Sequence, residues 1–176
     1  MKYVAFLRGI NVGGNSLVKM ADLKKAFEAR GFKNIQTILA SGNVIFESKT
    51  ADPEALTRKI ETLLKKQWGR SIAVFVRTVD ELSKMSALQP FKGVTIESTT
   101  RLYVTFLSEN SRGLKLPELP SELRITRIKD DAVFSVLELS PKRNTTDSMA
   151  ILEKAFGPRI TTRNWNTIQK ILKAAI

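Results

Sequence analysis

The stretch YVAFLRGINVGG, residues 3–14, joins an apolar segment to a glycine-rich one near the start of the chain. Its first five residues are apolar at every position, which predicts a strand covered on both faces. Residues 8–14 then hold one arginine, one asparagine and three glycines. A loop of this composition exposes backbone N–H groups, which is how many proteins hold an anion. The stretch therefore predicts a central strand that ends in a polar binding loop.

The residues up to position 77 alternate between two apolar patterns. Helical spacing of apolar residues favours helices, and short β-rich runs favour strands. The predicted order is strand, helix, strand, strand, helix and strand, at residues 3–7, 20–30, 34–39, 44–48, 53–68 and 72–77. This βαββαβ order is that of the ferredoxin-like unit.

The ferredoxin-like order brings two polar segments together. Its first and third strands are antiparallel neighbours at the centre of the sheet, so the end of the first lies beside the beginning of the third. The loop at residues 8–14 is therefore expected against Ser41-Gly42-Asn43, the turn that leads into the third strand. The two segments are predicted to form two walls of one site.

The second half of the chain has the same mixture of strands and helices, but no close internal repeat is apparent. A capping box at residues 78–81 opens a short helix, and residues 129–132 are a hairpin turn. Strands are predicted at residues 101–107, 123–128 and 133–139, and helices at residues 145–156 and from near Thr162. We therefore expect a subdomain at 1–77, a helix and connector at 78–100, and a second α+β subdomain with C-terminal helices at 101–176.

The chain has 176 residues, with no cysteine and no histidine. The absence of cysteine excludes disulfides, thiolate zinc sites and cysteine nucleophiles. The absence of histidine excludes the commonest general base and every Ser-His triad. Any catalysis must therefore use carboxylates, lysine, arginine, tyrosine, hydroxyls, amides or backbone donors. No metal site or cofactor is expected, because Asp130-Asp131 is more simply a hairpin turn.

The formal net charge is +12, from 29 Lys and Arg residues against 17 Asp and Glu residues. This balance favours nucleic acid, anionic lipid or a phosphorylated ligand as partner. The alternative is a basic surface that serves only solubility. The apolar run after Lys2 ends at Leu7, which is too short for a signal peptide, and no run is long enough to span a bilayer. We expect a cytoplasmic protein without a membrane segment.

The glycine loop is only partly similar to a nucleotide P-loop. Gly9 and Gly14 have the P-loop spacing, but Asn15 stands where a lysine would reach the phosphates. A tight turn would explain the glycines. It would not explain Arg8 and Asn11, because a turn needs neither a cation nor an amide. An anion-binding or polar-ligand role remains the interpretation that uses both side chains.

A third polar cluster, TTRNWNT, occupies residues 161–167. One interpretation is a helix start with Thr162 as its N-cap and Trp165 in the core. Helix N-termini also attract anions, and the structural interpretation leaves Arg163, Asn164 and Asn166 unused.

Four segments resemble, in their order and spacing, the conserved-protein family catalogued as domain of unknown function 1697. They are LRGINVGG at residues 7–14, KMADL at 19–23, SGNVIF at 41–46 and TTRNWNT at 161–167. The resemblance implies a bacterial-type cytoplasmic protein of two ferredoxin-like α+β subdomains packed into one compact unit, with no established activity. Family members often carry a lysine soon after the double glycine, whereas Lys19 is the nearest basic residue here. The resemblance places the three polar clusters in one composite site.

The predicted site takes its charge from arginine and lysine, and its orientation from amides and loop N–H groups. Its predicted members are Arg8, Gly9, Asn11, Gly13, Gly14, Lys19, Ser41, Gly42, Asn43, Thr162, Arg163, Asn164 and Asn166. Binding of a small anionic or phosphorylated ligand is the first hypothesis. A second is phosphoryl or acyl-phosphate hydrolysis, by analogy with acylphosphatases, which are similar in topology. A third is non-specific nucleic-acid binding through the basic surface. Whether the protein is an enzyme, and its oligomeric state, stay open.

Overall fold

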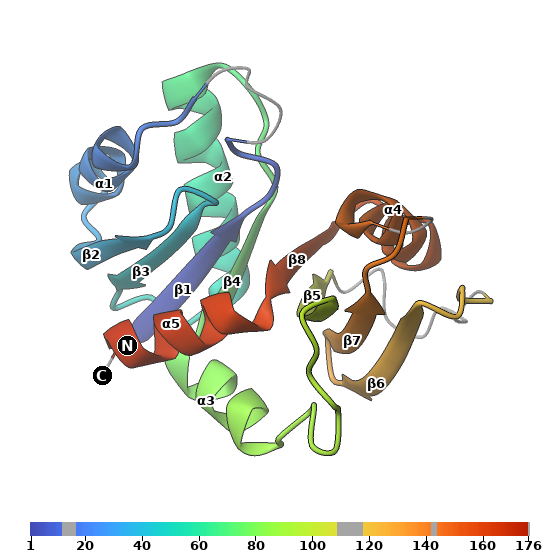
Figure 1. Ribbon diagram of the computed structural model, residues 1–176. Coiled ribbons are helices and arrows are strands. Elements are labelled where there is room, and N and C mark those ends of the chain that lie inside the picture. Colours follow the sequence, from blue (N-terminus) through green and yellow to red (C-terminus); the bar gives the residue numbers. More distant parts are fainter. Residues whose placement is uncertain (12–16, 109–117, 142–143, 176) are drawn as a thin grey trace. The chain divides into compact units, whose positions relative to one another are not determined.

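The computed structural model describes residues 1–11, 17–108, 118–141 and 144–175 (Figure 1). The chain divides into two units, residues 1–84 with 170–176 and residues 85–169. The division falls within α3, Val79–Ala87, and α5, Trp165–Ala175. Each unit contains one four-stranded sheet.

The first unit has the predicted βαββαβ order. Its elements are β1, Lys2–Leu7; α1, Met20–Ala29; β2, Lys33–Ile38; β3, Asn43–Glu47; α2, Pro53–Trp68; and β4, Val74–Thr78. The strand order is β2-β3-β1-β4, with β1 antiparallel to β3 and to β4. This is the ferredoxin-like arrangement, and the predicted pairing of the first and third strands is confirmed.

Helix α2 shows how local signals set the ends of an element. The Asp52 side chain accepts a hydrogen bond from the N–H of Glu54 at 2.9 Å, and Pro53 occupies the first turn. Gly69 ends the helix with a φ of 68°, a conformation that glycine adopts without steric cost. Between these ends, Leu56, Ile60, Leu63 and Leu64 are buried.

Strand β1 is the centre of the first core. All residues from Tyr3 to Leu7 are fully buried, so the predicted coverage of both faces is confirmed. One hydrophobic cluster joins β1 to apolar side chains of both α1 and α2, so the two helices cover the same face of the sheet. Aromatic side chains also pack in this core, where the ring centroids of Phe32 and Phe46 are 4.8 Å apart.

The second unit repeats this strand order. Its elements are β5, Thr100–Leu107; β6, Leu123–Lys129; β7, Ala132–Glu138; α4, Thr145–Phe156; and β8, Ile160–Asn164, with the sheet order β6-β7-β5-β8. The predicted last helix is present as α5, but its predicted start near Thr162 is wrong. The Thr162 hydroxyl lies 2.8 Å from the Thr105 hydroxyl on the neighbouring strand β5. The β-branched threonines therefore extend a strand, and α5 begins at Trp165.

The two sheets also share a short sequence repeat. Strand β1 contains YVAFL, residues 3–7, and β5 contains YVTFL, residues 103–107. The backbone hydrogen bonds at the C-terminal ends of these two strands also correspond. The Leu7 N–H donates to Gly42 at 2.8 Å, and the Leu107 N–H donates to Asp131 at 2.8 Å.

The repeat extends to the fourth strand of each sheet and the helix that follows it. Tyr3 pairs with Thr78, and Tyr103 pairs with Asn164. An arginine precedes each of these pairing residues, Arg77 in β4 and Arg163 in β8. The two units are therefore two versions of one fold.

Candidate functional site

The loop after β1 meets the turn before β3, as the topology predicted. The Leu7 N–H donates to the Gly42 carbonyl oxygen at 2.8 Å. On the other side, the Arg8 N–H donates to the Ala73 carbonyl oxygen at 2.9 Å, just before β4. The end of β1 is therefore fixed to both neighbouring strands, and the loop leaves from a rigid base.

Asn11 holds the two turns together. Its Nδ2 donates to the carbonyl oxygens of Val18 at 3.0 Å and Ala40 at 2.8 Å, and its Oδ1 accepts from the Val18 N–H at 2.7 Å. Its φ is 57°, a left-handed conformation that asparagine tolerates better than most residues. This side chain shapes the junction, since both of its N–H groups already bind the protein.

Gly42 allows the turn to approach the loop. Its φ is 80°, and a Cβ atom there would lie 2.7 Å from Ile10 Cδ1 and 3.0 Å from Leu7 Cβ. Asn43 follows, fully buried, and its Nδ2 donates to the Ile38 carbonyl oxygen at 2.8 Å and to Ser41 Oγ at 3.1 Å. The turn is therefore held by its own side chains.

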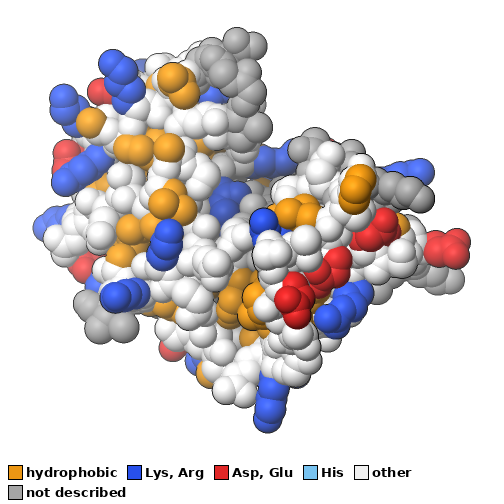
Figure 2. Space-filling view, viewed as in Figure 1, with side chains coloured by type: hydrophobic (Ala, Val, Ile, Leu, Met, Phe, Trp, Pro, Cys, Tyr) orange, Lys and Arg blue, Asp and Glu red, His pale blue; other side chains and the backbone are white. Residues whose placement is uncertain are grey.

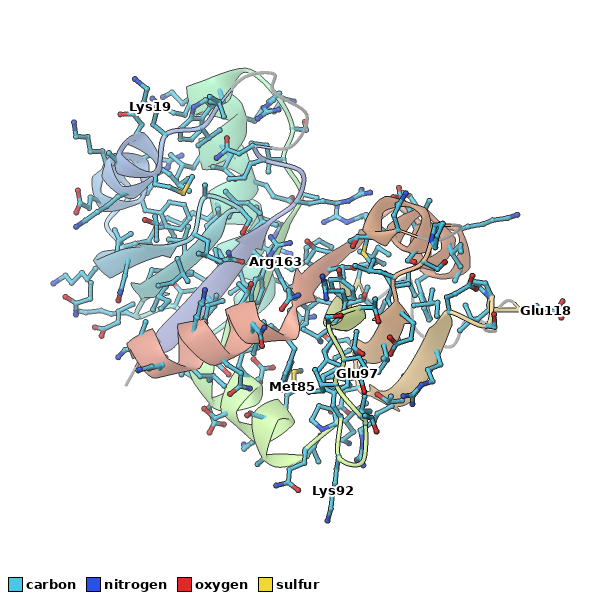
Figure 3. The ribbon with its side chains drawn as sticks, viewed as in Figure 1. Lys19, Met85, Lys92, Glu97, Glu118 and Arg163 are labelled. Atoms are coloured by element: carbon cyan, nitrogen blue, oxygen red, sulfur yellow. The ribbon has the colours of Figure 1, made fainter. Side chains whose placement is uncertain are left out.

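Two predicted cations accompany this junction. Arg8 is half-buried at the end of β1. Lys19 is exposed immediately before α1 (Figure 3). Gly9, which has a φ of 66°, is also exposed. The predicted members Gly13 and Gly14 lie outside the described residues.

Left-handed backbone is concentrated in the two joined turns. Gly9, Asn11, Leu39 and Gly42 have φ values of 66°, 57°, 60° and 80°. Sequence reasoning missed Leu39, because leucine carries no signal for a positive φ. It also missed the carbonyl groups of Val18 and Ala40, which depend on how the loop closes.

The third predicted cluster belongs to the second unit. Arg163 is 9% exposed, and its Nη1 donates to Thr161 Oγ1 and to the Thr162 carbonyl oxygen, both at 2.9 Å. Burial removes water from the guanidinium and lowers the pKa of Arg163 from 12.5 to about 10. Asn164 Oδ1 accepts from the Asn166 N–H at 2.9 Å, so Asn164 is the N-cap of α5. The interpretation of Thr162 as the N-cap is wrong.

The repeat explains this cluster in structural terms. In the first unit, Arg77 Nη1 donates to the Val76 carbonyl oxygen at 2.8 Å, as Arg163 does to Thr162. Thr78 and Glu81 then form a capping box at the start of α3. An arginine and a cap at a strand–helix junction thus belong to the fold of both units. The loop 8–11 and the turn 39–42 are the part of the predicted site that the structure brings together.

Over the part of the chain that the structure describes, no group of three or more acidic side chains could hold a metal ion. None of the described helices has the length and apolar character needed to cross a membrane.

Two ferredoxin-like units in one chain define the class of this α+β protein. The family model described as "Protein of unknown function (DUF1697)" matches residues 1–134, and the chain belongs to that family. Its fold is similar to that of the conserved bacterial protein SP0830 from Streptococcus pneumoniae, with a TM-score of 0.75 and 21% sequence identity. That similarity covers 99% of this chain and 98% of the other. No curated protein matches the chain significantly.

Proposed function

We propose that this protein binds a small anionic or phosphorylated ligand where the loop after β1 meets the β2–β3 turn. The observation that carries the proposal is the set of four left-handed residues in two turns that Asn11 joins. Backbone in sparsely populated conformations gathers at ligand clamps, where the rest of the fold maintains it. Such turns also aim N–H groups toward one point.

The charge distribution supports an anionic ligand for the first unit. That unit holds 17 Lys and Arg residues against 8 Asp and Glu residues, a net charge of +9. The second unit holds 12 against 9, a net charge of +3. In Figure 2, Lys and Arg side chains are scattered over the part of the view that holds α1, β2 and β3. The net charge of the first unit therefore favours the approach of anions to that unit.

Arg8 and Lys19 supply the charge in this proposal. Arg8 lies at the fixed end of β1, so a bound oxyanion would meet a cation whose backbone position is set by the sheet. Lys19 is exposed and directly follows Val18, whose backbone N–H donates to Asn11 Oδ1. Neither amide of Asn11 and Asn43 is required to contact the ligand, since both are used within the protein.

A thermal-shift panel tests the proposal. A ligand at 100 times its Kd stabilises the folded state by about 2.7 kcal/mol, which raises Tm by roughly 5–10 °C for a chain of this size. We expect at least one phosphorylated metabolite or inorganic polyphosphate to produce such a rise. The rise should shrink in Arg8→Gln and Lys19→Gln, and it should persist in Lys25→Gln, a matched control on exposed α1 surface.

Flat melting curves across the panel would contradict the proposal. So would an equal rise in Arg8→Gln and the unaltered protein, provided that their ligand-free Tm values agree.

A further inference from the structure

We infer that the ligand of this junction is amphiphilic, with an apolar group that packs on Leu17 and Leu39 beside its anionic group. The inference rests on the proposed function and names its ligand class. Leu17 is 71% exposed and Leu39 is 48% exposed. Both are large apolar side chains that the fold of this chain leaves open to solvent.

The two leucines belong to the same junction. Asn11 Nδ2 donates to the carbonyl oxygen of Val18, which follows Leu17, and to that of Ala40, which follows Leu39. Two Cα–Cα steps of about 3.8 Å, two distances of about 2.4 Å from a Cα atom to its own carbonyl oxygen, and the two hydrogen bonds of 3.0 and 2.8 Å set an upper limit of roughly 18 Å between the leucine Cα atoms. One asparagine side chain therefore holds the backbone next to each leucine at the same junction.

Leu39 occupies a backbone conformation that does not suit it. Its φ is 60°, and a Cβ atom makes this conformation unfavourable. The other non-glycine residues with positive φ in the described part of the chain are Asn11, Asn34, Gln89 and Asp130, all polar. Asparagine or glycine would fit position 39 with less strain, and burial does not compensate for the leucine. A contact outside this chain explains why a leucine stands there.

Charge next to the leucines argues for an anionic amphiphile. Lys19 lies two residues after Leu17 and is exposed. Arg8 lies three residues before Asn11. A purely apolar partner would take water from the exposed Lys19 without pairing its charge, whereas an anionic group pairs with it. An alkyl phosphate, or an acyl group joined to a phosphate or carboxylate, has both parts.

Titration calorimetry with inorganic phosphate, butyl phosphate and octyl phosphate tests the inference. A fully buried methylene raises affinity about fourfold, so partial burial on two leucines should raise affinity at least tenfold from phosphate to octyl phosphate. Leu39→Asn should keep phosphate binding and lose most of this rise. Ile96→Asn, at a leucine-sized side chain that is 66% exposed in the second unit, should behave as the unaltered protein.

The outcomes separate the inference from the proposed function. Phosphate binding with the same affinity across the series would overturn the inference and leave the proposed function standing. An equal rise in Leu39→Asn would also overturn it. No binding of any member of the series would overturn both.

Vesicles distinguish the two sources of such a ligand. Co-sedimentation with vesicles that contain phosphatidic acid, lost in Leu39→Asn, would support the inference and assign the ligand to a lipid surface. A rise in affinity from phosphate to octyl phosphate without co-sedimentation would support it and assign the ligand to a free metabolite.

Discussion

The Tyr3 hydroxyl is buried in the first core and responds to pH. Its Oη donates to the Thr50 carbonyl oxygen at 2.9 Å, and its ring stacks on Phe46. Burial, and then the carboxylates of Glu81 and Asp52, raise the pKa of Tyr3 above 10.0. The folded protein therefore holds this proton at a pH where the unfolded chain has released it. The stabilisation of the folded state by this raised pKa is fully present below about pH 10 and is lost as the pH rises through the folded-state pKa of Tyr3.

Tyr3→Phe isolates this effect. At pH 8 we expect the variant to be less stable by about 1 kcal/mol, because it loses one hydrogen bond. At pH 11 the gap should narrow or reverse, because only the unaltered protein retains an ionisable group at this position. Urea unfolding of both proteins at the two pH values gives the comparison, and lysine deprotonation cancels in the difference. A gap of equal size at pH 8 and pH 11 would show that the pKa of Tyr3 is not raised.

At the scale of elements, Gly42 and Gly9 provide a matched pair. Both have positive φ, but only Gly42 faces Ile10 and Leu7 at distances that exclude a Cβ atom, whereas nothing lies within 4 Å at Gly9. Gly9→Ala should cost roughly 1–2 kcal/mol of unfolding free energy from backbone strain alone. Gly42→Ala should cost roughly 2–4 kcal/mol, since overlap with Ile10 adds to the strain. Chemical denaturation measures both, and equal losses would contradict the close packing of turn and loop.

Helices and strands differ in how well their ends can be predicted from the sequence. Helix α2 was predictable at both ends because its signals are local, an Asp-Pro start and a glycine stop. Strand β8 was not, because Thr162 and Asn164 are both good N-cap residues and the partner that decides between them, Thr105, is 57 positions away. Likewise, topology predicted that loop and turn would meet. It could not predict that Asn11 would bind them together, because that depends on loop closure.

At the scale of the whole molecule, the repeat separates what the fold requires from what the first unit adds. Both units fix the end of their first strand to the following hairpin at 2.8 Å. The second unit has Asp130-Asp131 in that hairpin, where two carboxylates would repel an anion. Its net charge of +3, against +9 for the first unit, points the same way. We therefore expect an anion at the end of β1 in the first unit and not at the end of β5 in the second.

The burial of the central strands limits how this protein could bind nucleic acid. RNA-recognition sheets of this topology stack bases on exposed aromatic side chains of the two central strands. Phe6 and Phe46, on β1 and β3, are fully buried. A role for the +12 charge in nucleic-acid binding would therefore rest on salt-dependent contacts with phosphates and not on base stacking.

Titration of inorganic phosphate into the ¹⁵N-labelled protein, followed by the backbone amide shifts, tests the anion site most directly. We predict saturable shifts at Gly9, Asn11, Lys19 and Gly42, with one common Kd. Ser108 and Asp131, which correspond to Arg8 and Gly42 in the second unit, should stay unchanged. Shifts that fail to saturate and spread over both units, or equal shifts at Gly42 and Asp131, would contradict an anion site at the end of β1.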